Sequence, residues 1–241
     1  IKKTIPVVIS ETQPFVKDIF ISKAFESGSR ISFADQRFSC ILNDNDSRKG
    51  TRRYKVVDMA TDQKYEGDTV LCGDYQSLNL KALFSVFLNL NDIFSCSDKN
   101  ISDGIRNVVI NTGLAGRWQI LNNEPLTICD TGHNKEGLEY VMEQIRRIPK
   151  SGLHMVLGFV NDKDLNSVLP LFPAEATYYF TRASIPRALN EETLKSEAAR
   201  FGLIGNSYRD VKSALLQAIK NAEKSEMIFI GGSTFVVAEV V

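Results

Sequence analysis

The chain has 241 residues, of which 43% are hydrophobic and 24% are charged, the balance of a globular protein with one large domain or two ordinary ones. Basic and acidic residues number 29 each, so the formal net charge is zero. That neutrality argues against a general nucleic-acid binder, which carries a basic excess. No apolar run approaches the ~20 residues that span a bilayer.

The cysteines and histidines do not form a metal-binding pattern. The four cysteines are Cys40, Cys72, Cys96 and Cys129, with no Cys-x-x-Cys pair, and there are only two histidines. A zinc site is therefore not indicated. Reduced thiols in a cytoplasmic protein are the favoured interpretation, with disulfides as the alternative. The chain begins with Ile1 rather than methionine, which we interpret as a processed or truncated start.

The first 70 residues alternate short β-rich runs with polar turns. Strands are predicted over 6–9, 30–33, 53–59 and 68–71, a strand or the start of a helix at 19–21, and a hairpin tip or loop over 43–53.

The apolar period then changes to that of helices. A helix is predicted over 79–90, and a second one through Ile101, Ile105 and Val108, capped by Ser102 or Asp103. The small residues 113–116 mark a break, where we place a domain boundary.

Beyond this break, strands and helices alternate regularly. Strands are predicted over 117–121, 126–129, 153–160, 176–181 and 227–230, and helices over 135–148, 164–171, 191–201, 211–224 and 234–241. Strands that are apolar throughout and alternate with helices indicate parallel β-α-β units with both faces covered.

Polar residues follow three of these strands. Asp130 follows the strand 126–129, Asp162 follows 153–160, and Ser233 follows 227–230. Ligands of open parallel sheets bind beyond the carboxyl ends of the strands, where helix N-termini favour anions. The alternative is that all three residues are ordinary helix caps.

Asp130 and His133 form the sharpest pair of candidate catalytic residues. Their spacing of three places both on one strand-to-helix turn, where a carboxylate could accept from ribose hydroxyls or hold a cation, and an imidazole could orient an amine or a carboxylate. Arg117 could clamp a phosphate, or it could be a surface residue. The single tryptophan, Trp118, is expected in the core. Asn79 could bind an adenine edge or cap its helix.

The chain has neither a G-x-x-x-x-G-K-[ST] nor a G-x-G-x-x-G motif. The residues alone therefore indicate an α/β protein with an anion site on one sheet edge.

Six segments in order resemble a known family. They are Thr112-Gly113-Leu114-Ala115-Gly116-Arg117-Trp118-Gln119, Asp130-Thr131-Gly132-His133-Asn134, Gly73-Asp74-Tyr75-Gln76 with Asn79, Asp162-Lys163-Asp164, Thr181 with Pro186-Arg187-Ala188, and Gly231-Gly232-Ser233. Together they look like the folylpolyglutamate synthase and dihydrofolate synthase family, the folate branch of the Mur-ligase-like enzymes. The resemblance covers essentially the whole chain.

The resemblance implies a fold in two parts. Residues 1–115 would be the last part of a Mur-ligase-type central ATPase domain, and residues 116–241 a Rossmann-like glutamate-ligase domain with a mostly parallel sheet. Members of this family carry a P-loop and Mg²⁺ ligands upstream of the segment that begins here at Ile1. We therefore expect this chain to be the C-terminal portion of a longer enzyme and to be inactive alone.

The activity implied by the resemblance is ATP-dependent amide ligation. ATP would phosphorylate a carboxylate of dihydropteroate or folate, and L-glutamate would attack the acyl phosphate. Asn79, Arg117 and Asp130 would bind ATP, while His133 and Ser233 would hold the glutamate. Nucleic acid and membrane are not expected partners, and the intact enzyme is expected to be a monomer.

Two other interpretations stay open. One is a cell-wall Mur-type ligase, which shares the Asp-x-x-His-Asn and Gly-Arg patterns. The other is a non-catalytic nucleotide-binding module, because a fold does not by itself fix a function.

Overall fold

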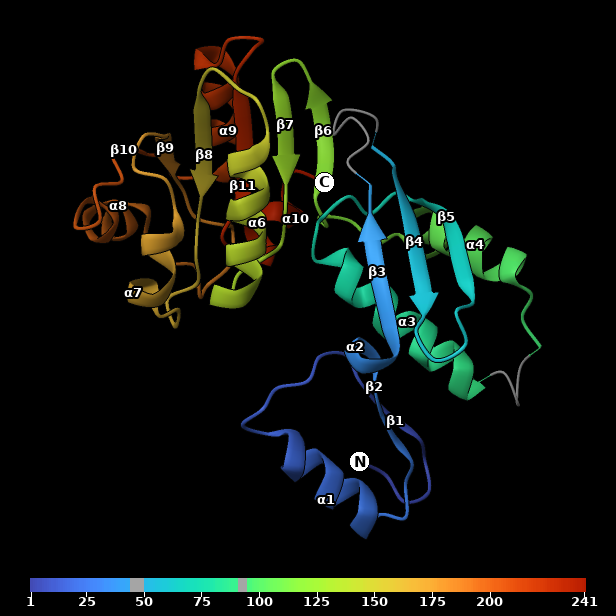
Figure 1. Ribbon diagram of the computed structural model, residues 1–241. Coiled ribbons are helices and arrows are strands. Elements are labelled where there is room, and N and C mark those ends of the chain that lie inside the picture. Colours follow the sequence, from blue (N-terminus) through green and yellow to red (C-terminus); the bar gives the residue numbers. More distant parts are fainter. Residues whose placement is uncertain (44–49, 91–94) are drawn as a thin grey trace. The chain divides into compact units, whose positions relative to one another are not determined.

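The computed structural model describes residues 1–43, 50–90 and 95–241 (Figure 1). The chain divides into two compact units. The first is built mainly from residues 1–70 and 75–112, and the second from 71–74 and 113–241. Among the described residues, no helix is both long and apolar enough to cross a membrane.

A six-stranded sheet in the order β10-β9-β8-β11-β7-β6 forms the centre of the second unit. Its strands are β6 (Gln119–Asn123), β7 (Leu126–Cys129), β8 (Leu153–Leu157), β9 (Thr177–Phe180), β10 (Gly205–Ser207) and β11 (Met227–Gly231). Five strands run parallel, and β6 pairs antiparallel with β7 at one edge. The expected mostly parallel, Rossmann-like sheet is confirmed.

Helices cover both faces of this sheet, with α6 in front of it and α9 behind it in Figure 1. They are α6 (Lys135–Arg147), α7 (Leu165–Val168), α8 (Glu191–Ala199), α9 (Val211–Asn221) and α10 (Thr234–Ala238), with a 3-10 turn at Leu169–Leu171. Ile228 and Ile230 of β11 pack with Ala214 and Ala218 of α9 in one buried cluster. Because every residue of β11 is buried, its apolar run is the sequence signature of a two-sided central strand.

The first unit contains two smaller sheets. One is a parallel pair, β1 (Val7–Ile9) with β2 (Ile31–Phe33), and the other is the antiparallel sheet β3 (Phe38–Leu42), β4 (Arg52–Asp58) and β5 (Lys64–Thr69). Its helices are α1 (Lys17–Glu26), α2 (Ala34–Arg37), α3 (Gln76–Leu90), α4 (Asp98–Arg106) and α5 (Val108–Thr112). Phe84 of α3 packs against Phe38 and Tyr54 of the antiparallel sheet.

Several predicted boundaries in the first unit are wrong. The strand expected over 68–71 is β5 at Lys64–Thr69. Of the two alternatives at 19–21, the helix is confirmed and the strand is wrong, because these residues lie in α1. Ser97 caps α4, in place of Ser102 or Asp103, by accepting a hydrogen bond from the Asn100 amide. Part of the predicted 43–53 loop, residues 44–49, lies outside the described residues.

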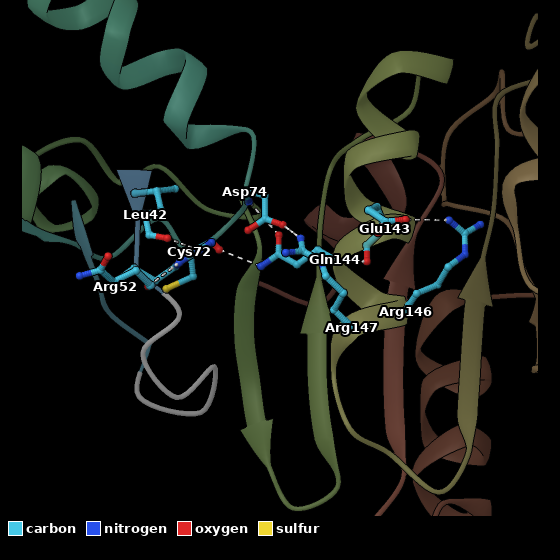
Figure 2. A network of polar contacts seen from close by, with 9 residues as sticks. Leu42, Arg52, Cys72, Asp74, Glu143, Gln144, Arg146 and Arg147 are labelled. Atoms are coloured by element: carbon cyan, nitrogen blue, oxygen red, sulfur yellow. Dashed lines mark hydrogen bonds and ion pairs between the residues drawn. The ribbon is translucent and has the colours of Figure 1, made fainter. Parts of the chain in front are cut away.

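A side chain of α6 holds the short segment 71–74 within the second unit. Gln144 donates from Nε2 to the carbonyl oxygen of Cys72 over 2.9 Å, and its Oε1 accepts from the amide of Asp74 over 2.8 Å. Arg147, one turn further along α6, forms an ion pair with the Asp74 carboxylate (Figure 2). A residue of a parallel strand bonds its neighbouring strand in the same way, to one carbonyl oxygen and to the amide two residues later. The side chain of Gln144 thus takes the place of a neighbouring strand along the segment 71–74.

The ion pair between Arg37 and Asp58 makes the stability of the first unit depend on pH. Arg37 donates to Asp58 from Nε over 2.6 Å and from Nη2 over 2.7 Å, and the Asp58 side chain is 2% exposed. Hydrogen bonds from Arg37, and a further one from the Ala60 amide, hold the pKa of Asp58 below its usual range. A carboxyl group whose pKa is lower in the folded than in the unfolded chain stabilises the fold above the unfolded pKa of about 3.9.

We therefore expect the unfolding free energy to fall as the pH drops below about 5 and through the folded pKa of Asp58. The Asp58→Asn variant should be less stable near pH 7 and should show a flatter loss of stability in acid. Urea titrations between about pH 7 and pH 2.5 measure both effects. Parallel curves for the two proteins would contradict the assignment of this acid sensitivity to Asp58.

Candidate functional site

The carboxyl ends of the parallel strands meet in a tightly packed edge of the second unit. The amide of Gly158, after β8, donates to the carbonyl oxygen of Gly231, and the amide of Thr181, after β9, donates to that of Leu157 over 2.8 Å. Gly232 has φ of +87°, and a Cβ there would lie 2.8 Å from the oxygen of Gly158. The glycines therefore let the loops after β8 and β11 touch through their backbones.

Asp130 follows β7, and its carboxylate is buried, at 2% exposed. Oδ2 accepts from the amide of Trp118, and Oδ1 accepts from the amide of Gly132, each over 2.7 Å. The capping interpretation of Asp130 is wrong, because Asn134 caps α6 by accepting from the Gly137 amide over 3.0 Å.

Arg117 lies between two residues with left-handed backbone, Gly116 at φ of 71° and Trp118 at φ of 49°. Trp118 is 1% exposed, so the expectation that it lies in the core is confirmed. The Arg117 side chain is half-buried and forms no hydrogen bond or ion pair with the part of the chain that the structure describes. A guanidinium without a protein partner is suited to an anionic ligand.

His133 is exposed on the turn that precedes α6. Its Nδ1 lies 3.0 Å from the carbonyl oxygen of Thr131. Because a carbonyl oxygen only accepts, Nδ1 carries the proton in this contact, and Nε2 remains for other partners. The predicted position of His133 at the sheet edge is therefore confirmed. Its role in binding a ligand stays a prediction.

Ser233 is buried at 5% exposed and caps α10, since its Oγ accepts from the amide of Phe235 over 3.2 Å. The capping interpretation is thus confirmed for Ser233. It is wrong for Asp162, because Asp164 caps α7. Next to this loop, the Arg187 guanidinium lies over the Phe235 ring at 4.8 Å, a contact that the sequence did not indicate.

Asn79 belongs to the first unit. It is exposed in the first turn of α3 and donates from Nδ2 to Oε1 of Gln76 over 2.9 Å. Because α3 begins at Gln76, the interpretation of Asn79 as a helix cap is wrong.

The described residues include no group of three or more His, Cys, Asp or Glu side chains that could hold a metal ion. All four cysteines are free thiols. Burial, together with the neighbouring Asp130 charge, raises the pKa of Cys129 to about 12. Cys129 is therefore a packing residue of β7 and an unreactive thiol at neutral pH.

Residues 116–234 match the family described as Mur ligase, glutamate ligase domain. The chain is 29% identical over 146 residues to the dihydrofolate synthase/folylpolyglutamate synthase of Escherichia coli strain K12, a match that covers 60% of this chain and 33% of that protein. It is 22% identical over 247 residues to the enzyme of the same name from Bacillus subtilis strain 168, covering 100% of this chain and 55% of the relative.

Solved structures share the fold over nearly the whole chain. Folylpolyglutamate synthase of Mycobacterium tuberculosis, complexed with ADP and AMPPCP, aligns with a TM-score of 0.81 and 20% identity, over 98% of this chain and 54% of that one. Escherichia coli FolC in complex with DHPP and ADP aligns with a TM-score of 0.74 and 21% identity, over 99% and 53%.

The chain thus spans between one third and about half of the length of these relatives. Its matched domain occupies the unit that carries Arg117, Asp130, His133 and Ser233. Residues 116–234 thus correspond to a Mur ligase glutamate ligase domain, and the chain as a whole is similar to folylpolyglutamate and dihydrofolate synthases.

Proposed function

We propose that this chain is part of an ATP-dependent ligase that joins L-glutamate to dihydropteroate, to folate, or to both through an acyl phosphate. The observation that carries the proposal is the loop of residues 130–134, which lies at the carboxyl edge of the sheet inside the matched glutamate ligase domain. The Arg117 guanidinium and Nε2 of His133 are polar groups near this loop that are available for a ligand.

In this proposal the candidate residues take the roles that the family resemblance implies. Arg117 would bind a nucleotide phosphate in bidentate fashion, and Asn79 would also contact the nucleotide. His133 and Ser233 would hold the incoming glutamate, with Nε2 of His133 accepting from its amine. The nucleotide supplies the phosphoryl group that activates the carboxylate, and the acceptors and donors of this chain orient the amino acid.

Divalent metal chemistry is part of the proposal, but its ligands are not assigned to this chain. The described residues offer no cluster of metal-ligating side chains. The chain contributes cationic and hydrogen-bonding groups, and a Mg²⁺ ion would be held by other parts of the enzyme. We place the enzyme in the cytoplasm, as a monomer that binds neither nucleic acid nor membrane.

Calorimetric titrations of the chain test this function. We expect a non-hydrolysable ATP analogue and L-glutamate to bind, and a UDP-linked muramyl peptide to give no signal. Binding of the UDP-linked peptide in preference to folate would support a cell-wall ligase instead. Nucleotide binding with no response to L-glutamate, with or without dihydropteroate, would support a non-catalytic nucleotide-binding module.

Single substitutions assign the two ligands to their residues. Arg117→Ala should weaken nucleotide binding by about 10- to 100-fold, because a charge-assisted phosphate contact is lost. His133→Ala should weaken L-glutamate binding and leave nucleotide binding unchanged. The control is Arg200→Ala, which removes an exposed guanidinium paired with Glu197 at the end of α8. Equal losses in the Arg117 and Arg200 variants would contradict the role of Arg117.

A further inference from the structure

The buried carboxylate of Asp130 connects two segments of backbone that are separate in sequence. Its Oδ2 accepts from the Trp118 amide and its Oδ1 from the Gly132 amide, each at 2.7 Å. Short bonds to a charged acceptor in a buried site are stronger than ordinary backbone hydrogen bonds. Both oxygens of Asp130 therefore already serve the protein itself.

The segment before β6 is held in a costly conformation. Trp118 has φ of 49°, a left-handed value that bulky residues rarely adopt. Its indole is 1% exposed, and Nε1 has no hydrogen-bond partner among the described residues. The strained backbone persists because the Asp130 carboxylate accepts a hydrogen bond from the Trp118 amide and the buried indole ring holds Trp118 in place.

One further hydrogen bond joins the same two segments, and another stabilises the first of them internally. The Thr131 amide donates to the carbonyl oxygen of Gly116 over 2.9 Å, and the Gly116 amide donates to Oε1 of Gln119 over 2.8 Å. A Cβ at Gly116 would lie 2.6 Å from Cγ1 of Val237 and 2.8 Å from Cγ2 of Thr131. The segments 116–119 and 130–132 thus form one fastened unit, which we call the Asp130 clamp.

The clamp ends at two candidate ligand-binding residues. Arg117 directly precedes Trp118, whose amide donates to Oδ2 of Asp130. His133 directly follows Gly132, whose amide donates to Oδ1 of Asp130. One carboxylate therefore determines the backbone position of both. Resting on the function proposed above for these two residues, we propose that Asp130 is a positioning residue that sets Arg117 and His133 for nucleotide and glutamate.

Asparagine at position 130 is the decisive substitution. It keeps the shape but offers one carbonyl oxygen, so its NH₂ group would face one of the two backbone amides. Because Trp118 is the single tryptophan of the chain, its fluorescence reports directly on the clamp. We expect Asp130→Asn to shift Trp118 emission to longer wavelength and to increase its quenching by acrylamide several-fold.

The ligand titrations distinguish positioning from packing. Asp130→Asn should weaken both the ATP analogue and L-glutamate, each by about ten-fold, the loss expected when a hydrogen-bonded arrangement of this kind is broken. Arg117→Ala should affect only the nucleotide, and His133→Ala only the glutamate. Asp130→Glu, which keeps the carboxylate, should recover part of both affinities and also tests the proposal if the asparagine variant fails to fold.

The matched control is Asp210→Asn. Asp210 is another aspartate whose side chain accepts from a backbone amide, that of Ser213 over 2.7 Å at the start of α9. Its substitution should leave the Trp118 emission and both affinities unchanged.

Three results would overturn the proposal. Weaker binding with unchanged Trp118 emission and quenching would mean that Asp130 touches the ligand itself. Altered emission with both affinities intact would mean that the clamp serves packing alone. If the unsubstituted chain binds neither ligand, the proposed function fails for this chain. The positioning role of Asp130 is then tested by amide hydrogen exchange. Unchanged exchange at Arg117, Gly132 and His133 in Asp130→Asn would refute that role.

Discussion

A Gly232→Ala chain is expected to lose about 3 kcal/mol or more of unfolding free energy. Two costs coincide at this position. The backbone has φ of +87°, which L side chains rarely adopt, and an added Cβ would meet the carbonyl oxygen of Gly158 at 2.8 Å and the Phe159 ring at 3.0 Å. Because the first obstacle is backbone at the end of a central strand, it cannot turn away as a flexible side chain would.

Gly202 provides the matched control, because alanine there meets the cost of the left-handed backbone without the cost of a close contact. Its φ is +75°, but the nearest atom to an added Cβ is the Cβ of Ala174 at 3.8 Å, an ordinary contact. Gly202→Ala should therefore cost only about 1 kcal/mol. Urea unfolding of the three proteins gives the comparison. If both variants lost the same free energy, close packing of the loops after β8 and β11 would not be what requires glycine at position 232.

The second large effect is expected from Gln144→Leu, at about 2–3 kcal/mol. Leucine fits the buried volume but removes both hydrogen bonds to the backbone of Cys72 and Asp74. Deleting one partner of a buried bond is costly, because the remaining polar group stays away from water. In hydrogen exchange, the Asp74 amide should become markedly less protected.

Gln217→Leu is the comparison for this variant. Gln217 lies on α9, and its Nε2 donates to Oδ1 of Asn221, one turn further along the same helix. We expect a change within about 0.5 kcal/mol. Equal effects of the two substitutions, or an Asp74 amide that stays protected in Gln144→Leu, would show that Gln144 does not hold the segment 71–74.

Continuous apolar runs were enough to predict the central strands. Met227–Gly231 is buried at every residue, and the sequence contains no competing period there. The strand Gly205–Ser207 was missed because it has no apolar or β-branched residue and pairs through its backbone along one side of β9. Phe38–Leu42 and the short helix Ala34–Arg37 were missed for a different reason: both depend on packing against residues distant in sequence.

In the candidate site too, local sequence patterns predicted some features, while contacts between residues distant in sequence determine others. The positions of Asp130 and His133 at a strand-to-helix turn follow from local pattern, and the structure agrees. Burial of Asp130 was not predictable, because its partner amide belongs to Trp118, whose left-handed backbone has no signal in its residue type. The ligand roles of Arg117 and Asn79 remain predictions, which the titrations above address.

The hold of Gln144 on the segment 71–74 also has a consequence for the order in which the chain can fold during synthesis. Gln144 lies 72 residues after Cys72 and 70 after Asp74. At ~5–20 residues per second, a ribosome needs ~4–14 seconds to make the chain between them. During that time the helices of the first unit at 76–112 are themselves made, while the segment 71–74 still lacks its contacts with Gln144. The segment 71–74 is therefore completed late, although it is made early.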